Sequence, residues 1–183
     1  MNKYLLDVYN PFKVEFLYGK GSTLFDKKGN DYIDFTSGIG VSCLGHGNKK
    51  LVETISKQAK KFLHLSNIYP INTQEECAKK VAALSGYKNM QGFFCNSGAE
   101  ANETAIKFIR KYAKSKGIKK HNIITLENSF HGRTIATLNA TGQKDKQLGF
   151  EPFPNEFIYA KNLEDTKNKI DKNSVAVMIE LVQ

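Results

Sequence analysis

A short polar segment, Asn96-Ser97-Gly98-Ala99-Glu100, stands between an apolar run and a long amphipathic run of the sequence. A serine and a glycine at the start of a helix present free backbone N–H groups and the positive end of the helix dipole, an arrangement that binds anions. Gly98 would let the backbone approach a phosphate closely, and Ser97 would add a hydroxyl donor. The same residues also fit an ordinary N-cap, so this segment alone leaves both interpretations open.

A second polar segment, Ser129-Phe130-His131-Gly132-Arg133-Thr134, follows the next apolar run. Phe130 offers a flat face for a ring, and Arg133 offers a bidentate grip on a carboxylate. A core phenylalanine and a surface arginine fit these two residues equally well. We interpret His131 as a packed side chain rather than a catalytic one.

A third segment places the glycine-rich run Ser37-Gly38-Ile39-Gly40-Val41 shortly before Gly45-His46-Gly47. Closely spaced glycines bring backbone against a ligand, or they simply make turns. By themselves these residues do not decide between the two.

The elements that would position these segments follow from the hydrophobic pattern. We expect a β meander in the first third, helices next, and then strands alternating with helices. The predicted strands cover 13–18, 23–25, 32–35, 92–95, 122–126, 157–159 and 175–179, and the predicted helices 49–62, 73–84, 98–116, 134–140 and 163–170. The apolar stripe of the helix over 98–116 is predicted to consist of Ala101, Ala105, Phe108, Ile109 and Tyr112. Such alternation predicts an α/β fold with a mainly parallel sheet, whose carboxyl edge is where ligands bind.

Composition excludes several classes of protein. An apolar fraction of 40% and a charged fraction of 25% are those of a globular domain, and no apolar run reaches the ~18 residues of a membrane span. The net charge is +9, but 25 of the 27 basic residues are scattered lysines, which argues against nucleic-acid binding. Three cysteines without metal-ligand spacing predict buried thiols, no metal site and a reducing compartment, the cytoplasm.

Taken in order, the motifs resemble the class III pyridoxal-phosphate-dependent aminotransferases, and most of all the branch that acts on acetylornithine. The resemblance covers essentially the whole chain. It rests on Asp31 to Phe35, Leu44-Gly45-His46, the run Asn96-Ser97-Gly98-Ala99-Glu100-Ala101-Asn102-Glu103, Phe130-His131-Gly132-Arg133-Thr134, and Glu180 to Gln183. Leu181 and Val182 stand where the family usually has proline and isoleucine.

The resemblance implies a fold-type-I transferase and a role for each motif. Ser97, Gly98 and Ala99 would form the cup for the phosphate of pyridoxal 5'-phosphate (PLP). Phe130 would stack on the pyridine ring, and Glu180 would lie near its far side. Arg133 would hold the substrate carboxylate. An aliphatic Ile39 would suit an acylated substrate better than free ornithine. The implied reaction moves the terminal amino group of N2-acetyl-L-ornithine to 2-oxoglutarate, as in arginine biosynthesis, in a homodimer.

The resemblance also implies that the chemistry is incomplete in this chain. The family's Schiff-base lysine would lie beyond Gln183, so no catalytic residue is assigned here, and the chain alone should not transaminate. The last predicted strand ends without a closing element, and we expect a fragment. We assign 1–48 to a β-rich segment of a small domain and 49–183 to the first part of the large cofactor domain. Two alternatives remain: another class III ω-aminotransferase (for succinylornithine, 4-aminobutyrate or β-alanine), or a non-catalytic product that binds a ligand or dimerises.

Overall fold

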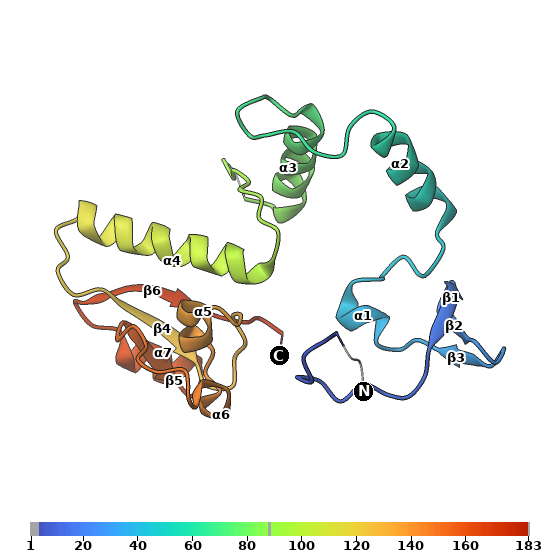
Figure 1. Cartoon of the computed structure of the whole chain (residues 1–183). Coiled ribbons are helices and arrows are strands. Elements are labelled where there is room, and N and C mark those ends of the chain that lie inside the picture. The colour runs from blue at the N-terminus through green and yellow to red at the C-terminus, as the bar shows by residue number, and fades with distance from the viewer. Residues whose placement is uncertain (1–3, 88, 183) are drawn as a thin grey trace. The chain divides into compact units, whose positions relative to one another are not determined.

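The computed structural model describes residues 4–87 and 89–182, and the chain divides into two compact units, Met1–Gln74 and Glu75–Gln183. In chain order (Figure 1) the elements are β1 (Phe16–Lys20), β2 (Thr23–Asp26), β3 (Asp31–Ile33), α1 (Ser37–Gly40), α2 (Lys49–Ala59), α3 (Asn72–Ser85), α4 (Gly98–Ser115), β4 (Asn122–Leu126), α5 (Ile135–Ala140), α6 (Lys144–Gln147), β5 (Phe157–Ala160), α7 (Leu163–Lys169) and β6 (Ser174–Met178). The predicted domain boundary at residue 48 concerns the domains of the family's fold, and it stays a prediction.

The first unit begins with the predicted meander. Strands β1, β2 and β3 form one antiparallel sheet in that order. Between β2 and β3 the carboxylate of Asp26 accepts hydrogen bonds from the amides of Lys28 (2.8 Å) and Asn30 (2.9 Å), which closes the polar turn. The three predicted strands are therefore present, although β1 begins three residues later than predicted and β3 ends two residues earlier than predicted. The short turn α1 was not predicted.

Helices α2 and α3 agree with the predicted ranges to within a few residues. The side chain of Asn48 caps α2 by accepting a hydrogen bond from the amide of Leu51 at 3.1 Å, as N-cap asparagines do. Helix α3 begins one residue before the predicted start. None of the helices in the described part of the chain is long and apolar enough to cross a membrane.

The second unit contains a parallel sheet with the strand order β5-β4-β6. Strand β4 has a neighbour on each side, and its residues 122–125 are buried. The run Ile-Ile-Thr is typical of a strand in a parallel sheet. Helix α7 packs against β4 and β5. The predicted parallel α/β arrangement is confirmed.

Helix α4 packs on this sheet through a face that matches the predicted stripe only in part. Its buried residues are Ile106 and Ala113, and Ile106 forms a cluster with Ile123 of β4 and Met178 of β6. Ile109 of the predicted stripe packs against this cluster, as predicted, whereas Phe108 and Tyr112 are 63% and 55% exposed, so the prediction was wrong for those two. An amphipathic helix with two apolar rows can turn either one inward, and here the contact with the sheet selects the row that contains Ile106.

Two further expectations are wrong. Residues 92–95 were predicted as a strand, but they pair with no strand among the described residues. A strand exists only through hydrogen bonds to a neighbour, which an apolar run cannot supply by itself. The cysteines were predicted to be buried, yet Cys43 and Cys77 are exposed and Cys95 is intermediate. These thiols therefore take little part in the core.

Candidate functional site

The N-terminus of α4 leaves two backbone amides unbonded within the described residues. The hydroxyl of Ser97 accepts a hydrogen bond from the amide of Glu100 at 3.2 Å, which makes Ser97 the N-cap. The amides of Gly98 and Ala99 have no acceptor among the described residues, and a Cβ added to Gly98 would meet nothing within 4 Å. The 18-residue helix α4 thus begins with a capping serine and two amides that have no acceptor, and there is open space beside Gly98. This geometry fits a phosphate.

The segment that follows β4 is fastened to the first turns of α4. The side chain of Asn102 donates a hydrogen bond to the carbonyl of His131 at 2.8 Å, and the hydroxyl of Thr134 donates to the carboxylate of Glu103. Gly132 lies so close to α4 that an added Cβ would stand 2.9 Å from the Cβ of Ala99. The two motifs singled out in the sequence therefore form one surface.

Glu180, which follows β6, reaches the same surface. Its Oε2 accepts a hydrogen bond from the amide of Phe130 at 3.0 Å. Phe130 is 49% exposed, and the guanidinium carbon of Arg133 lies 6.0 Å from the centre of its ring. The segment that contacts the α4 N-terminus therefore carries a partly exposed aromatic ring, Phe130, and a cation, Arg133. The carboxylate of Glu180 lies beside it.

His131 lies beneath this surface and is only 5% exposed, as the packed interpretation predicts. Its amide donates to the hydroxyl of Thr141 at 2.9 Å, while its Nε2 has no partner within the described structure. Burial lowers the pKa of His131 below the ordinary value of 6.5, against a smaller opposing effect of Glu180. The imidazole is therefore neutral at pH 7.

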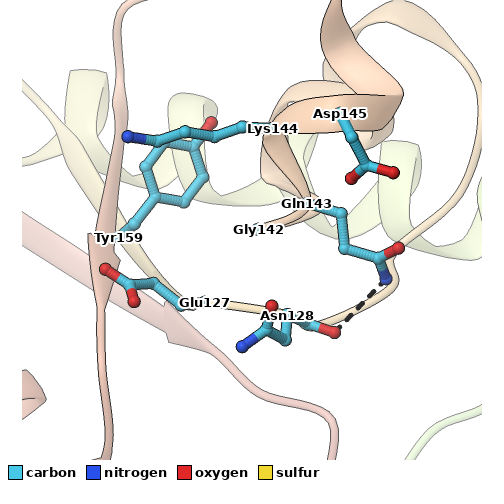
Figure 2. Close-up of a pocket in the computed structure, with 7 residues that line it drawn as sticks. All are labelled: Glu127, Asn128, Gly142, Gln143, Lys144, Asp145 and Tyr159. Atoms are coloured by element: carbon cyan, nitrogen blue, oxygen red, sulfur yellow. Dashed lines mark hydrogen bonds between the residues drawn. The ribbon is translucent and has the colours of Figure 1, made fainter.

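A pocket of about 370 Å³ is lined by the residues that directly precede this segment and by residues 142–145, and polar side chains dominate its lining (Figure 2). The residues that line it are Glu127, Asn128, Gly142, Gln143, Lys144, Asp145 and Tyr159. Gln143 donates to the carbonyls of Asn128 and Ser129, both at 3.3 Å. Gly142 is required here, because an added Cβ would stand 2.3 Å from the carbonyl oxygen of Leu126. The pocket wall thus supports the residues that lead into Phe130.

Most of the candidate residues named from the sequence lie in the second unit. Ser97, Gly98, Ala99, Phe130, Arg133 and Glu180 belong to the surface just described. Ile39 lies in the first unit, on a left-handed turn, and is 94% exposed. The contacts made by Asn102, Glu103 and Thr141 were not predicted, because no local pattern shows which distant residue each side chain will bind.

Comparison with known proteins decides the family. The model of the aminotransferase class-III family matches residues 7–183. The chain belongs to the class III aminotransferase family. It is 51% identical over 183 residues to the acetylornithine aminotransferase of Wolinella succinogenes, covering 99% of this chain and 46% of that protein. It is 47% identical to that of Methanocaldococcus jannaschii, with coverage of 99% and 46%. The chain thus spans about half the length of the curated relatives it matches.

Solved structures agree with this family assignment. The ornithine aminotransferase of Toxoplasma gondii, with PLP at partial occupancy in its active site, superposes with a TM-score of 0.89 at 28% identity, covering 99% of this chain and 43% of that one. The N-acetylornithine aminotransferase of Stenotrophomonas maltophilia gives a TM-score of 0.75 at 32% identity, with coverage of 94% and 43%. The predicted fold class is confirmed.

Proposed function

We propose that this class III aminotransferase chain carries the phosphate cup, the stacking ring and the carboxylate clamp of an enzyme that uses PLP to move the terminal amino group of N2-acetyl-L-ornithine to 2-oxoglutarate. The observation that carries the proposal is the N-terminus of α4, with two open amides packed beside the Phe130–Arg133 segment. When bound, PLP supplies the electron sink that amino-group transfer requires.

The phosphate of the cofactor fits the α4 N-terminus. The amides of Gly98 and Ala99 would donate to its oxygens, and the Ser97 hydroxyl can still donate its proton because its oxygen only accepts from Glu100. Hydrogen bonds to a charged group contribute roughly 1.5–3 kcal/mol each, so two amides alone would favour a phosphorylated ligand by about 3–6 kcal/mol.

The ring and the substrate are proposed to sit on the segment after β4. The exposed face of Phe130 would stack on the pyridine ring. Glu180 would fix the Phe130 backbone through its hydrogen bond and lie on the far side of the ring. Arg133 would hold the substrate carboxylate with both prongs of its guanidinium, a geometry that lysine does not provide.

We further propose that none of the 25 lysines of this chain bonds covalently to the cofactor. A lysine activated as a nucleophile needs a desolvated site or a neighbouring cation. Every lysine in the described residues is exposed except Lys169, which is half-buried and donates to the carbonyl of Tyr159 and to Asp165. The required lysine would therefore come from outside residues 1–183.

The acylated substrate, a role in arginine biosynthesis, a cytoplasmic location and a homodimer also belong to this proposal. Acetylornithine aminotransferases among the relatives support the substrate. The aliphatic Ile39 supports an acylated amine over free ornithine, whose second ammonium group an exposed apolar side chain would not stabilise. Sedimentation analysis of the protein checks the dimer.

The test is amino transfer by the protein purified from the cells that make it. We expect turnover of N-acetylornithine with 2-oxoglutarate, and borohydride reduction should leave one phosphopyridoxyl group on a lysine outside residues 1–183. Faster turnover of succinylornithine, 4-aminobutyrate or β-alanine would replace the substrate. An intact mass of 20.6 kDa without a stoichiometric adduct would replace the enzyme with a ligand-binding or dimerising product.

A further inference from the structure

The turn that contains Ile39 has an unusual backbone. Four consecutive residues have positive φ: Ser37 (47°), Gly38 (63°), Ile39 (61°) and Gly40 (77°). The left-handed region suits glycine, whereas a β-branched residue there is a genuine outlier. The Ile39 side chain is 94% exposed, so contacts within the described chain do not compensate for its conformation. Strained residues that the surrounding structure holds in place cluster at ligand-binding positions.

The carboxylate of Asp34 holds this turn from one end. Its Oδ1 accepts hydrogen bonds from the amide of Thr36 (3.1 Å), the hydroxyl of Thr36 (2.9 Å) and the amide of Ser37 (2.8 Å). The amides of Ile39 and Gly40 then donate to the carbonyl of Thr36 at 2.7 and 3.1 Å. One carboxylate oxygen thus organises the start of the turn.

The other carboxylate oxygen is held by His46. The Nε2 of His46 lies 2.8 Å from Oδ2 of Asp34, and the Asp34 side chain is only 8% exposed. The hydrogen bond from His46, with smaller contributions from Thr36 and Ser37, lowers the pKa of Asp34 below its ordinary value of 3.8. The acceptor therefore stays ionised at neutral pH, which strengthens each bond that it receives.

The position of His46 is in turn fixed by the meander. Its amide donates to the carbonyl of Gly21 at 2.7 Å, and its carbonyl accepts from the amide of Gly21 at 2.9 Å. A Cβ on Gly19 would stand 2.6 Å from Cγ of His46, so only glycine allows the imidazole to lie against β1. The ring and the backbone of His46 are thus both anchored to the sheet.

We propose that Asp34 and His46 are positioning residues, which together hold residues 37–40 in the left-handed turn that presents Ile39 to the apolar part of an acylated amine substrate. The substrate half of this inference rests on the proposed function, whereas the positioning half does not. Neither residue needs to touch the substrate, because each acts through the backbone of the turn.

Amide hydrogen exchange of the whole protein tests the positioning half without any activity. His46→Ala should accelerate exchange of residues 36–42 at least about tenfold, since a charge-assisted bond is lost. His46→Gln, whose amide nitrogen can replace Nε2, should restore slow exchange. His64→Ala removes an exposed histidine of the same unit and should change nothing. If His46→Ala is no faster than wild type, the positioning role is wrong.

Steady-state kinetics test the substrate half. His46→Ala should raise KM for N-acetylornithine about tenfold with a smaller change in kcat, and His46→Gln should recover most of the loss. Ile39→Ala should raise KM to a similar extent while exchange in residues 36–42 stays slow. Faster exchange with an unchanged KM would overturn the link to the substrate. If the wild type turns over no amine donor, the proposed function fails, and hydrogen exchange still decides the positioning role.

Discussion

Replacing Gly132 with alanine tests how the segment after β4 is packed against α4. An added Cβ would stand 2.5 Å from Oγ1 and 2.8 Å from Cβ of Thr137, and 2.9 Å from Cβ of Ala99. Forcing atoms into such a contact costs about 1–3 kcal/mol. The backbone φ of 135° at Gly132 adds a further ~1–3 kcal/mol for a residue with a side chain.

The expected loss for Gly132→Ala is therefore about 2–6 kcal/mol of the free energy of unfolding, a large part of the ~5–15 kcal/mol that a domain has. Urea unfolding followed by circular dichroism measures it, and with a slope of about 2 kcal/mol per molar the midpoint should fall by ~1 M or more. Gly98→Ala is the matched control, because its added Cβ meets no atom within 4 Å. A Gly132→Ala midpoint equal to that of wild type would refute the described packing.

Three other changes test separate parts of the account. Gly98→Ala should leave the free energy of unfolding unchanged or raise it by up to ~1 kcal/mol. It should weaken PLP binding about tenfold, because the added methyl group blocks the approach of the phosphate; unaltered binding by fluorescence titration would contradict this. Glu180→Gln keeps an acceptor for the Phe130 amide but removes the negative charge, so the affinity for PLP should fall about fivefold. Glu180→Ala should lower it further, and equal affinities in the wild type and both variants would argue against a role for Glu180. Burial lowers the pKa of His131, so as the pH falls below 6.5 the unfolded chain protonates this imidazole before the folded chain does. The contribution of His131 to the free energy of unfolding should therefore decrease below pH 6.5 and stay constant above pH 6.5. His131→Gln should remove that part of the slope in urea unfolding at pH 5.0–7.5, and an identical slope would show that His131 does not cause it.

The elements with a clear period were predictable from the sequence. Strand β4 lies where the run Asn122 to Leu126 placed it, and α4 begins after the predicted cap. What the pattern could not give was the choice between two apolar rows of α4, because the sheet makes that choice. The apolar run 92–95 likewise resembles a strand, but pairing depends on a neighbouring strand, and none of the described strands pairs with it.

The gathering of the motifs in one place was predictable from the sequence, but the contacts that join them were not. The anion-binding character of Ser97 and Gly98 follows from residue types at a helix start. The residues that join the motifs are polar side chains distant in sequence, such as Asn102 with His131, 29 residues apart, and Glu180 with Phe130, 50 residues apart. The pairing of Asp34 with His46 was missed likewise, because only the folded meander brings them together.

The central claim is that the α4 N-terminus binds the cofactor phosphate, and one pair of ligands tests it most directly. 4-Deoxypyridoxine 5'-phosphate and 4-deoxypyridoxine both lack the aldehyde that would react with surface lysines, and they differ only in the phosphate. In calorimetric titration of the purified protein, the phosphorylated ligand should bind at least about 100-fold more tightly, as two charge-assisted hydrogen bonds require, and Gly98→Ala should reduce that ratio. Equal affinities for the two ligands would contradict the account.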